Sequence, residues 1–583
     1  MTRNLEHVLG RLAQSKWPNI LLLLMAGLYV ASHVAALFTE SINWDEFLLF
    51  QRAARAVATG ELPGGGRPGL GTLLLLPFVN GCTETFPTVM GMRLFWSLFT
   101  FGGLAGFYVL LRKSLRGSAT APAAAALGVA LLALVPIFMR WSLQVRTDQG
   151  AVALVLWGGV VLLHSAKKNV GWAVLAGALV GLGYLFSQKA IYVFALILLL
   201  AAGDVFVSAR LLWRRELWRL ALLAVGVFAP VALYRFALPV FFELTPTISM
   251  DQGLSLFDWY RKVLGFRVYH MMLPTLVPHG LLLLLLFHAT FRAIRLRSAQ
   301  LRPIVVATAI LLVGVGVGWF HASAFPYFWM TLGLFPAAAL AWGWQGICDM
   351  LPKYNRLIAL GLWLVLLGLA IPFRLETLEN SQHVQRDSFA FIEHNLPSDA
   401  KGYQVDGALF CRQEPDPLPS FYGHSLYVHF NGVDGKQRTS EFIDLFKQRQ
   451  VAFIVHTHRF KNFPAEVRAF WSKHYGLYFG NVSLAGVRLA VDDAATNAFE
   501  IIAPGRYRWM SDGDATSSVR IGEQELKNGE TLVLSAGAHQ AHVTGGKGGY
   551  LVYHTPVAPA LSPASFHSVE QLAEISGIRL QRQ

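Results

Sequence analysis

A short acidic stretch, Ser41–Phe47 (SINWDEF), directly follows the first long apolar segment of the chain. Its two carboxylates, Asp45 and Glu46, are therefore expected at a membrane–water boundary. Two interpretations of this pair compete. Asp45 could cap the helix that follows, because Asp is favoured at the positive end of a helix. Alternatively, one of the carboxylates could be a general base, placed where a lipid-borne substrate presents its reactive headgroup.

The composition indicates a membrane protein. Of the 583 residues, 54% are hydrophobic and only 14% are charged, which is too apolar for an ordinary soluble protein. The net charge of +14 would suggest nucleic acid as a partner in a soluble chain. Here many Lys and Arg residues lie in short loops between apolar segments, and no basic–aromatic nucleic-acid motif is present. We therefore expect membrane lipids, and no nucleic acid, as partners.

Apolar segments of spanning length recur throughout the first two thirds of the chain. They lie at about 18–38, 92–111, 121–139, 149–164, 170–187, 190–207, 217–237, 277–291, 303–320, 325–347 and 355–372. The sequence thus predicts a mainly α polytopic membrane protein with about eleven transmembrane helices. A basic start precedes the first segment, which could be a cleaved signal peptide; its length favours an uncleaved helix.

The loop charges predict the topology. With the N-terminus in the cytoplasm, the strongly basic loops all fall on the cytoplasmic side, as the positive-inside rule requires. These loops lie at 112–116, 167–168, 210–219, 292–302 and 353–356. An odd number of spans then places everything after about residue 373 outside the cytoplasm. Charged residues at membrane edges also gather on that outer side, which marks it as the functional face.

The first outer loop, about 39–91, predicts two short helices in the interface plane. Apolar residues at helical spacing indicate one helix near 47–58, and the apolar run 69–79 is too short to span. Between them lies Arg67, in a Gly-rich segment. Its planar guanidinium could grip a phosphate, or it could face lipid phosphates from a flexible turn.

Other outer loops contribute three further candidates. Asp148 opens the apolar segment that begins near 149 and could simply cap it. Arg146 lies two residues earlier. Lys189 lies between two apolar segments and needs an anionic partner there, which could be a lipid headgroup or a substrate phosphate.

A long outer loop, 243–270, mixes basic and aromatic residues. Such a loop suits a lid over a lipid headgroup, and loops of this length are often functional. Tyr327 lies in the last outer loop, where aromatics commonly form an interfacial belt. The candidate substrate-loop residues are Tyr260, Arg267, Tyr269, His270 and Tyr327.

After Arg374 the long apolar runs stop. Helices near 387–395, 439–449 and 464–474 around a strand at 451–455 predict an α/β domain over 375–494. Short strands between turn residues predict a β-sandwich-like domain over 495–583. Cys82 and Cys411 could share an oxidising compartment, but the sequence does not establish a pairing. His456 and His458 lack further ligands, so no metal site is expected.

Several short motifs follow in a characteristic order. They are Trp44-Asp45-Glu46 with Ala53 and Gly60, Arg67-Pro68, Asp148, Gln188-Lys189, and Phe325-Pro326-Tyr327-Phe328 followed by Pro336 and Ala337 to Ala339. Over about residues 1–375 this order resembles the GT-C glycosyltransferases. The greatest similarity is to the branch with the bacterial lipid A aminoarabinose transferases and the protein O-mannosyltransferases. Gln188 stands where that branch usually has Thr, and 321–325 lacks a basic residue often found there.

The resemblance implies a glycosyltransferase that moves a hexosyl or pentosyl group from a polyprenyl-phosphate donor. The acceptor would be a lipid, a glycan or a protein at the periplasmic face of a bacterial inner membrane. In the catalytic domain, 1–374, it implies Asp45 as general base beside Glu46, and Asp148 as a second carboxylate. Arg67 and Lys189, with Arg146, would hold the donor phosphate. No cofactor is required, although a divalent metal could bridge carboxylate and phosphate.

Two other classes of protein fit the apolar segments. A transporter or flippase would explain the spans and the edge charges, but no inverted repeat is apparent in the hydropathy. A non-catalytic envelope assembly protein would use the outer region for binding. A transporter would not explain a long acidic first loop with interfacial helices, which favours the transferase.

Overall fold

The computed structural model describes most of the chain and divides it into two compact units. The described residues are 17–60, 69–115, 121–165, 169, 171–208, 213–242, 273–295, 301–320, 328–350, 355–379, 382–404, 410–412, 430, 434–456, 460, 463–491, 496–512 and 517–557. The first unit, here called the helical unit, comprises Met1–Glu40, Arg55–Pro77 and Met90–Asn380. The second, here called the mixed unit, comprises Ser41–Ala54, Phe78–Val89 and Ser381–Gln583.

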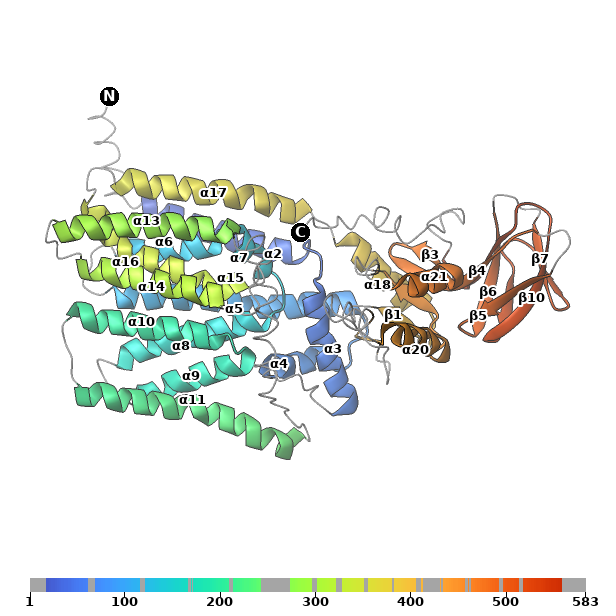
Figure 1. Cartoon of the computed structure of the whole chain (residues 1–583), viewed down its shortest axis with the longest axis horizontal. Coiled ribbons are helices and arrows are strands. Elements are labelled where there is room, and N and C mark those ends of the chain that lie inside the picture. The colour runs from blue at the N-terminus through green and yellow to red at the C-terminus, as the bar shows by residue number, and fades with distance from the viewer. Residues whose placement is uncertain are drawn as a thin grey trace, which may run out of the picture. The chain divides into compact units, whose positions relative to one another are not determined.

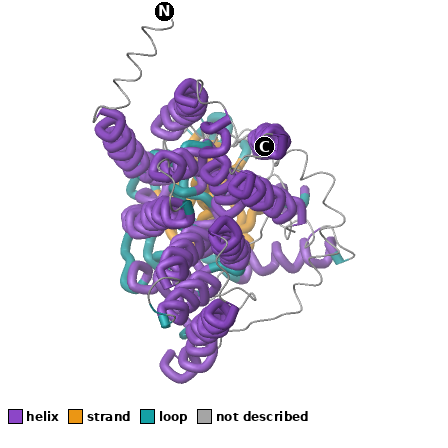
Figure 2. The backbone as a smooth tube through the Cα atoms, turned by 90° about the vertical axis from the view of Figure 1, so that its left-hand side faces the viewer, coloured by secondary structure: helices purple, strands orange, loops and turns teal. Residues whose placement is uncertain are grey.

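The helical unit consists of long apolar helices that run side by side (Figure 1), as the end-on view of the tubes also shows (Figure 2). In chain order the helices of this part of the chain are α2 (Trp17–Leu37), α3 (Trp44–Thr59), α4 (Leu70–Val79), α5 (Thr85–Ser114), α6 (Ala121–Ala133), α7 (Pro136–Trp141), α8 (Thr147–Ser165), α9 (Trp172–Phe186), α10 (Ala190–Ser208), α11 (Trp213–Phe242), α13 (Leu273–Arg295), α14 (Leu301–Phe320), α15 (Trp329–Leu332), α16 (Leu334–Met350) and α17 (Asn355–Glu379). The first residues of α3 and α5 belong to the mixed unit.

The predicted class, a multi-pass membrane protein, is supported by these helices. Among the described residues, five helical segments are long and apolar enough to cross a membrane: Thr85–Ser114, Thr147–His164, Ala190–Val207, Glu216–Phe236 and Leu301–Gly318. Shorter apolar helices, such as Trp172–Phe186, accompany them. The total of eleven spans and their sidedness remain predictions.

Two expected continuous helices are interrupted. The segment 121–139 forms α6 and α7, which are separated because Pro136 forces extended backbone on Val135, with φ −72° and ψ 129°. The segment that begins near 325 forms α15 and α16, which are separated at Gly333. A side chain there would overlap Trp329, since a Cβ atom on Gly333 would lie 2.8 Å from the indole nitrogen. By contrast, the segments near 180 and 200 are two separate helices, as expected.

Besides the first residues of α3 and α5, the described part of the mixed unit has three helices and two sheets. The helices are α18 (His383–Asn395), α20 (Gly435–Gln448) and α21 (Ala465–His474). The strands are β1 (Gly402–Gln404), β2 (Phe453–Val455), β3 (Tyr475–Phe479), β4 (Val482–Leu489), β5 (Asn497–Ile501), β6 (Gly505–Ser511), β7 (Ser518–Ile521), β8 (Gln524–Leu526), β9 (Thr531–Leu534), β10 (Gly537–Thr544) and β11 (Gly549–Tyr553). The expected helices and strands of this region are thus present.

The larger sheet continues through both regions that the sequence analysis treated as separate. It has seven strands in the order β1-β2-β4-β11-β6-β9, with β3 paired to β4, and the smaller sheet has the order β5-β10-β7-β8. The pairing of β4 with β11 joins residues 486–489 to 549–552 by antiparallel hydrogen bonds. The expected boundary at 494 therefore falls between strands of one sheet.

Two segments of the loop predicted to be the first outer loop, about 39–91, belong to the mixed unit. The backbone of Ile42 forms two hydrogen bonds with the Gln385 side chain, of 2.8 Å to its oxygen and 3.1 Å from its nitrogen. The rings of Phe47 and Phe389 meet edge to face at a centroid distance of 5.9 Å. The N-terminal half of α3, which carries Asp45, is thereby held against α18.

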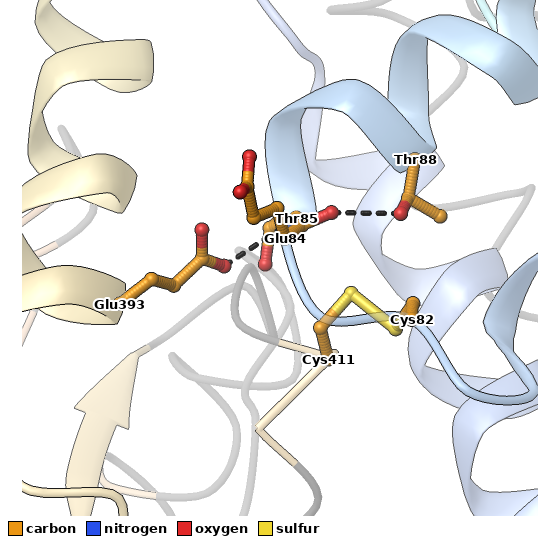
Figure 3. The surroundings of a disulfide bond; sticks show 6 residues. All are labelled: Cys82, Glu84, Thr85, Thr88, Glu393 and Cys411. Carbon is orange, nitrogen blue, oxygen red and sulfur yellow. Dashed lines mark hydrogen bonds between the residues drawn. A yellow bond between two sulfur atoms is a disulfide. The ribbon is translucent and has the colours of Figure 1, made fainter.

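A disulfide holds the second loop segment (Figure 3). Cys82 and Cys411 are bonded, with their Cα atoms 5.4 Å apart, although 329 positions separate them in the chain. Next to the disulfide, the backbone N–H of Thr85 donates a 2.8 Å hydrogen bond to Glu393 on α18. The sequence alone did not establish the pairing of Cys82 with Cys411.

Candidate active site

The N-terminus of α8 places Asp148 with its carboxylate directed away from the helix backbone. Gln149, at the third helical position, caps the helix, since its side-chain oxygen accepts the backbone N–H of Arg146 at 3.2 Å. The Gln149 side-chain nitrogen donates to the carbonyl of Ser142 at 2.9 Å. Asp148 is therefore not the capping residue considered from the sequence.

Asp148 binds the turn between α9 and α10. Its Oδ2 accepts a 2.7 Å hydrogen bond from Lys189 Nζ, and its Oδ1 accepts a 2.9 Å hydrogen bond from Ser187 Oγ. Asp148 is only 4% exposed, and the side chain of Lys189 is 18% exposed. Lys189, which lies between two apolar helices, requires an anionic partner, and that partner is the carboxylate of Asp148.

Arg146 is the second cation of this buried cluster. Its guanidinium lies 5.0 Å from the centre of the Trp141 ring and donates a 3.3 Å hydrogen bond to Gln144 Oε1. Its carbonyl accepts the indole N–H of Trp96 at 2.6 Å, which fixes the backbone at the start of α8. The charge of Arg146 also acts on Asp148.

The electrostatics of this cluster favour an anion. Two cations, Arg146 and Lys189, accompany one carboxylate, Asp148, so their charges sum to +1. Lys189 also lies 5.8 Å from the centre of the Phe328 ring. The cluster thus combines a net positive charge with a neighbouring aromatic ring, that of Phe328.

Short side chains bring neighbouring helices close to the cluster. A Cβ on Gly71 of α4 would lie 2.9 Å from the Cγ2 atom of Thr147, the residue before Asp148. A Cβ on Gly150 would overlap the Phe186 ring at 2.4 Å. Glycine at both positions lets α4 and α9 pack directly on the first turn of α8.

The N-terminus of α3, in the mixed unit, is capped by its third helical residue, as the N-terminus of α8 is in the helical unit. Asn43 is the N-cap, because its side chain accepts the backbone N–H of Asp45 at 3.0 Å. Glu46, which is buried, returns to accept the backbone N–H of Asn43 at 3.0 Å, completing a capping box. Of the expected acidic pair, Glu46 thus serves the helix end, and Asp45 is neither the cap nor fully buried.

Six of the predicted site residues lie outside the described part of the chain. They are Arg67, Tyr260, Arg267, Tyr269, His270 and Tyr327. Asp45 belongs to the mixed unit, whereas Asp148, Arg146 and Lys189 belong to the helical unit and are brought together there. Among the described residues, no group of three or more His, Cys, Asp or Glu side chains could hold a metal ion.

Two contributors to this site, Ser187 and Gln149, were not among the residues predicted from the sequence. Ser187 supplies a hydroxyl to Asp148, one residue before Gln188, where the resembling family usually carries Thr. Gln149 supplies the helix cap that leaves Asp148 available for Lys189. Both had a readable signal, because a hydroxyl precedes Gln188-Lys189 and Gln is common at the third position of a helix.

Ionisable residues buried in a bundle of apolar helices commonly mark a functional site. Residues 87–234, which include Asp148 and Lys189, match the family model "Dolichyl-phosphate-mannose-protein mannosyltransferase". The resemblance to GT-C glycosyltransferases expected from the motifs is confirmed over this segment. A comparison with curated protein sequences finds no significant match.

Three solved structures are distantly similar to this chain. ArnT from Cupriavidus metallidurans bound to undecaprenyl phosphate aligns at 16% identity with a TM-score of 0.43, over 76% of this chain and 93% of that one. Its apo state aligns at 16% identity with a TM-score of 0.46, over 81% and 98%. An oligosaccharyltransferase from Archaeoglobus fulgidus aligns at 11% identity with a TM-score of 0.42, over 78% and 73%.

Proposed function

We propose that the chain is a glycosyltransferase that moves a sugar from a polyprenyl-phosphate donor to an acceptor at the periplasmic face of a bacterial inner membrane. The observation that carries this proposal is the buried cluster of Asp148, Lys189 and Ser187 with Arg146 beside it. The cluster lies inside the segment that matches a family named for transfer from dolichyl-phosphate-mannose.

The chemistry divides among the residues as follows. Attack by an acceptor hydroxyl on the anomeric carbon breaks the bond to the lipid phosphate, and the phosphate leaves as an anion. Lys189 and Arg146, with Arg67, stabilise that leaving charge. Asp45 takes the hydroxyl proton. Asp148 holds the Lys189 ammonium at a fixed place rather than taking part as a base, because its two oxygens already bind Lys189 and Ser187.

The disulfide supports an outer location for the mixed unit. Disulfides persist in oxidising compartments such as the periplasm and are rare in the cytoplasm. Cys82 lies in the expected first outer loop, and Cys411 lies in the region after the last expected span. Both cysteines therefore fit one periplasmic compartment, in agreement with the topology predicted from loop charges.

The direct test is transfer by the purified protein. A panel of radiolabelled polyprenyl-phosphate sugars is offered with envelope lipid, polysaccharide and protein fractions as acceptors, and products are identified by mass spectrometry. Transfer by the wild type, and its loss in Lys189→Ala, is expected. Glu216→Gln is a matched control, because this glutamate pairs with Arg219 on α11 and not with the cluster. No transfer from any lipid-linked sugar, with uptake of the lipid instead, would favour a flippase.

A further inference from the structure

A second buried cation lies in the helical unit, and the proposed transfer reaction does not use it. Arg374, near the end of α17, is only 6% exposed. None of its three guanidinium nitrogens has a hydrogen-bond partner among the described residues. Its carbonyl accepts the hydroxyl of Thr377 at 2.8 Å, and Thr39 binds the Thr377 carbonyl at 2.8 Å, so the backbone at this position is fixed.

Two polar side chains of α2 lie beside this guanidinium. The centre of the Tyr29 ring lies 5.8 Å from the Arg374 Cζ atom, and the Tyr29 and His33 rings lie 6.0 Å apart. His33 is fully buried, and neither of its ring nitrogens has a hydrogen-bond partner among the described residues. Tyr29 and His33, four residues apart, thus lie on one face of α2, near a guanidinium that no described residue satisfies. We call Tyr29, His33 and Arg374 the α2–α17 cluster.

Among the described residues, no carboxylate forms a hydrogen bond with the Arg374 guanidinium. Glu40 and Glu376 each lie 3.8 Å from the guanidinium of Arg140, and Glu376 is largely exposed. Arg93 adds a third positive charge and donates to the carbonyls of Leu37 and Glu40 at the end of α2. Three arginines thus accompany two glutamates. Glu40 acts on Arg374 electrostatically but forms no hydrogen bond with its guanidinium.

A merely structural role does not explain Arg374. An exposed arginine at a membrane edge can reach headgroups, but this side chain is buried. A cation–π contact with one Tyr ring offsets only part of the cost of burying a charge without a hydrogen-bonded partner. Since no described residue satisfies the guanidinium, an anion that accepts its hydrogen bonds would complete the arrangement.

The surroundings indicate where that anion comes from. Apolar side chains of the same two helices are well exposed beside the cluster: Leu28 and Val30 on α2, and Ile371 and Leu375 on α17. Such side chains face acyl chains in a protein of this kind. We propose that the α2–α17 cluster binds the phosphate of an anionic lipid, with Arg374 as its bidentate ligand and His33 and Tyr29 as further partners. This site shares no residue with the Asp148–Lys189 cluster.

The test is thermal unfolding of delipidated protein in detergent, with and without added lipid. The probes are phosphatidylglycerol, undecaprenyl phosphate, zwitterionic phosphatidylcholine and inorganic phosphate. The variants are Arg374→Gln, which removes the charge, and Arg374→Lys, which keeps the charge but lacks the planar guanidinium needed for bidentate binding. Arg219→Gln is the matched control, because Arg219 is equally buried but bound by Glu216 and by the carbonyl of Leu162.

The wild type should gain several degrees in Tm with an anionic lipid, and native mass spectrometry should show the lipid retained. Arg374→Gln should lose that gain and be at least as stable as the wild type without lipid, because an unpaired buried charge has been removed. Arg219→Gln should be less stable but keep the gain. A response to only one anionic lipid identifies the source of the phosphate. An equal gain in wild type and Arg374→Gln, or a gain with inorganic phosphate alone, would overturn the proposal.

Discussion

The N-termini of α3 and α8 follow one local pattern in two different settings. In each, the third helical residue, Glu46 or Gln149, accepts the backbone N–H of the residue that precedes the helix. In each, an aspartate precedes that capping residue. Asp148 is buried and bound by Lys189 and Ser187, whereas Asp45 is partly exposed at its helix end.

The difference separates two roles for chemically identical side chains. A carboxylate that already neutralises a buried lysine is a poor proton acceptor, because protonation would break the ion pair. A carboxylate at a partly exposed helix end can be reached by an acceptor hydroxyl. The comparison therefore favours Asp148 as a positioning residue and Asp45 as the base of the proposed reaction.

The largest expected effect comes from breaking the buried pair. Lys189→Ala or Asp148→Ala leaves one charge without its partner and should destabilise the helical unit by about 3–5 kcal/mol. Chemical unfolding in detergent micelles measures the change. The double variant Asp148→Asn/Lys189→Met should be less destabilised than the two single changes together, as expected for coupled residues. Strict additivity of the two changes would show that the pair contributes no coupling.

The second effect concerns the disulfide of the mixed unit, the unit to which the N-terminal half of α3 belongs. Changing Cys82 and Cys411 to Ser should destabilise the mixed unit by about 2–4 kcal/mol, because the bond closes a long loop in the unfolded chain. Thermal unfolding with and without a reducing agent measures the effect, with Cys348→Ser as the control for loss of a thiol. If a reductant leaves the wild type unchanged, the bond does not form in the protein.

The two caps should have smaller and similar effects. Glu46→Ala and Gln149→Ala each remove one side-chain bond to a helix N-terminus and should cost about 1 kcal/mol. Hydrogen exchange of the first turns of α3 and α8 gives a local measurement. Gln149→Ala should also lower transfer activity, since the start of α8 positions Asp148. Unchanged exchange at both helix ends would remove the basis of the comparison.

The positions of most helices and strands could be predicted, because hydrophobic period and segment length record them locally. The interruption at Pro136 was also readable, and the Asn43…Glu46 spacing is a recognisable capping box. The sequence nevertheless left Asp45 open as a possible cap, since an acidic residue at a helix start fits the general preference equally well. Residue preferences at helix N-termini therefore do not distinguish Asn43 from Asp45 as the capping residue.

Pairings between distant residues could not be predicted. Cys82 and Cys411 lie 329 positions apart, and Lys189 lies 41 positions from Asp148. Nothing in a single sequence specifies which distant partner a charge or a thiol meets. The need of Lys189 for an anion was evident from its apolar flanks, but the partner depends on how α8, α9 and α10 pack. The buried state of Arg374 likewise depends on packing between α2 and α17.

The most direct test of the central claim compares Asp45→Asn with Asp148→Asn in transfer at saturating donor, using the sugar that the donor panel identifies. The amide keeps the size of each side chain and removes its charge. Asp45→Asn should fold normally, retain donor binding and lose about a hundredfold or more in turnover, as expected for loss of a general base. Asp148→Asn should lose stability and donor affinity first, because Lys189 loses its partner. Near-normal turnover by a folded Asp45→Asn protein would contradict the account.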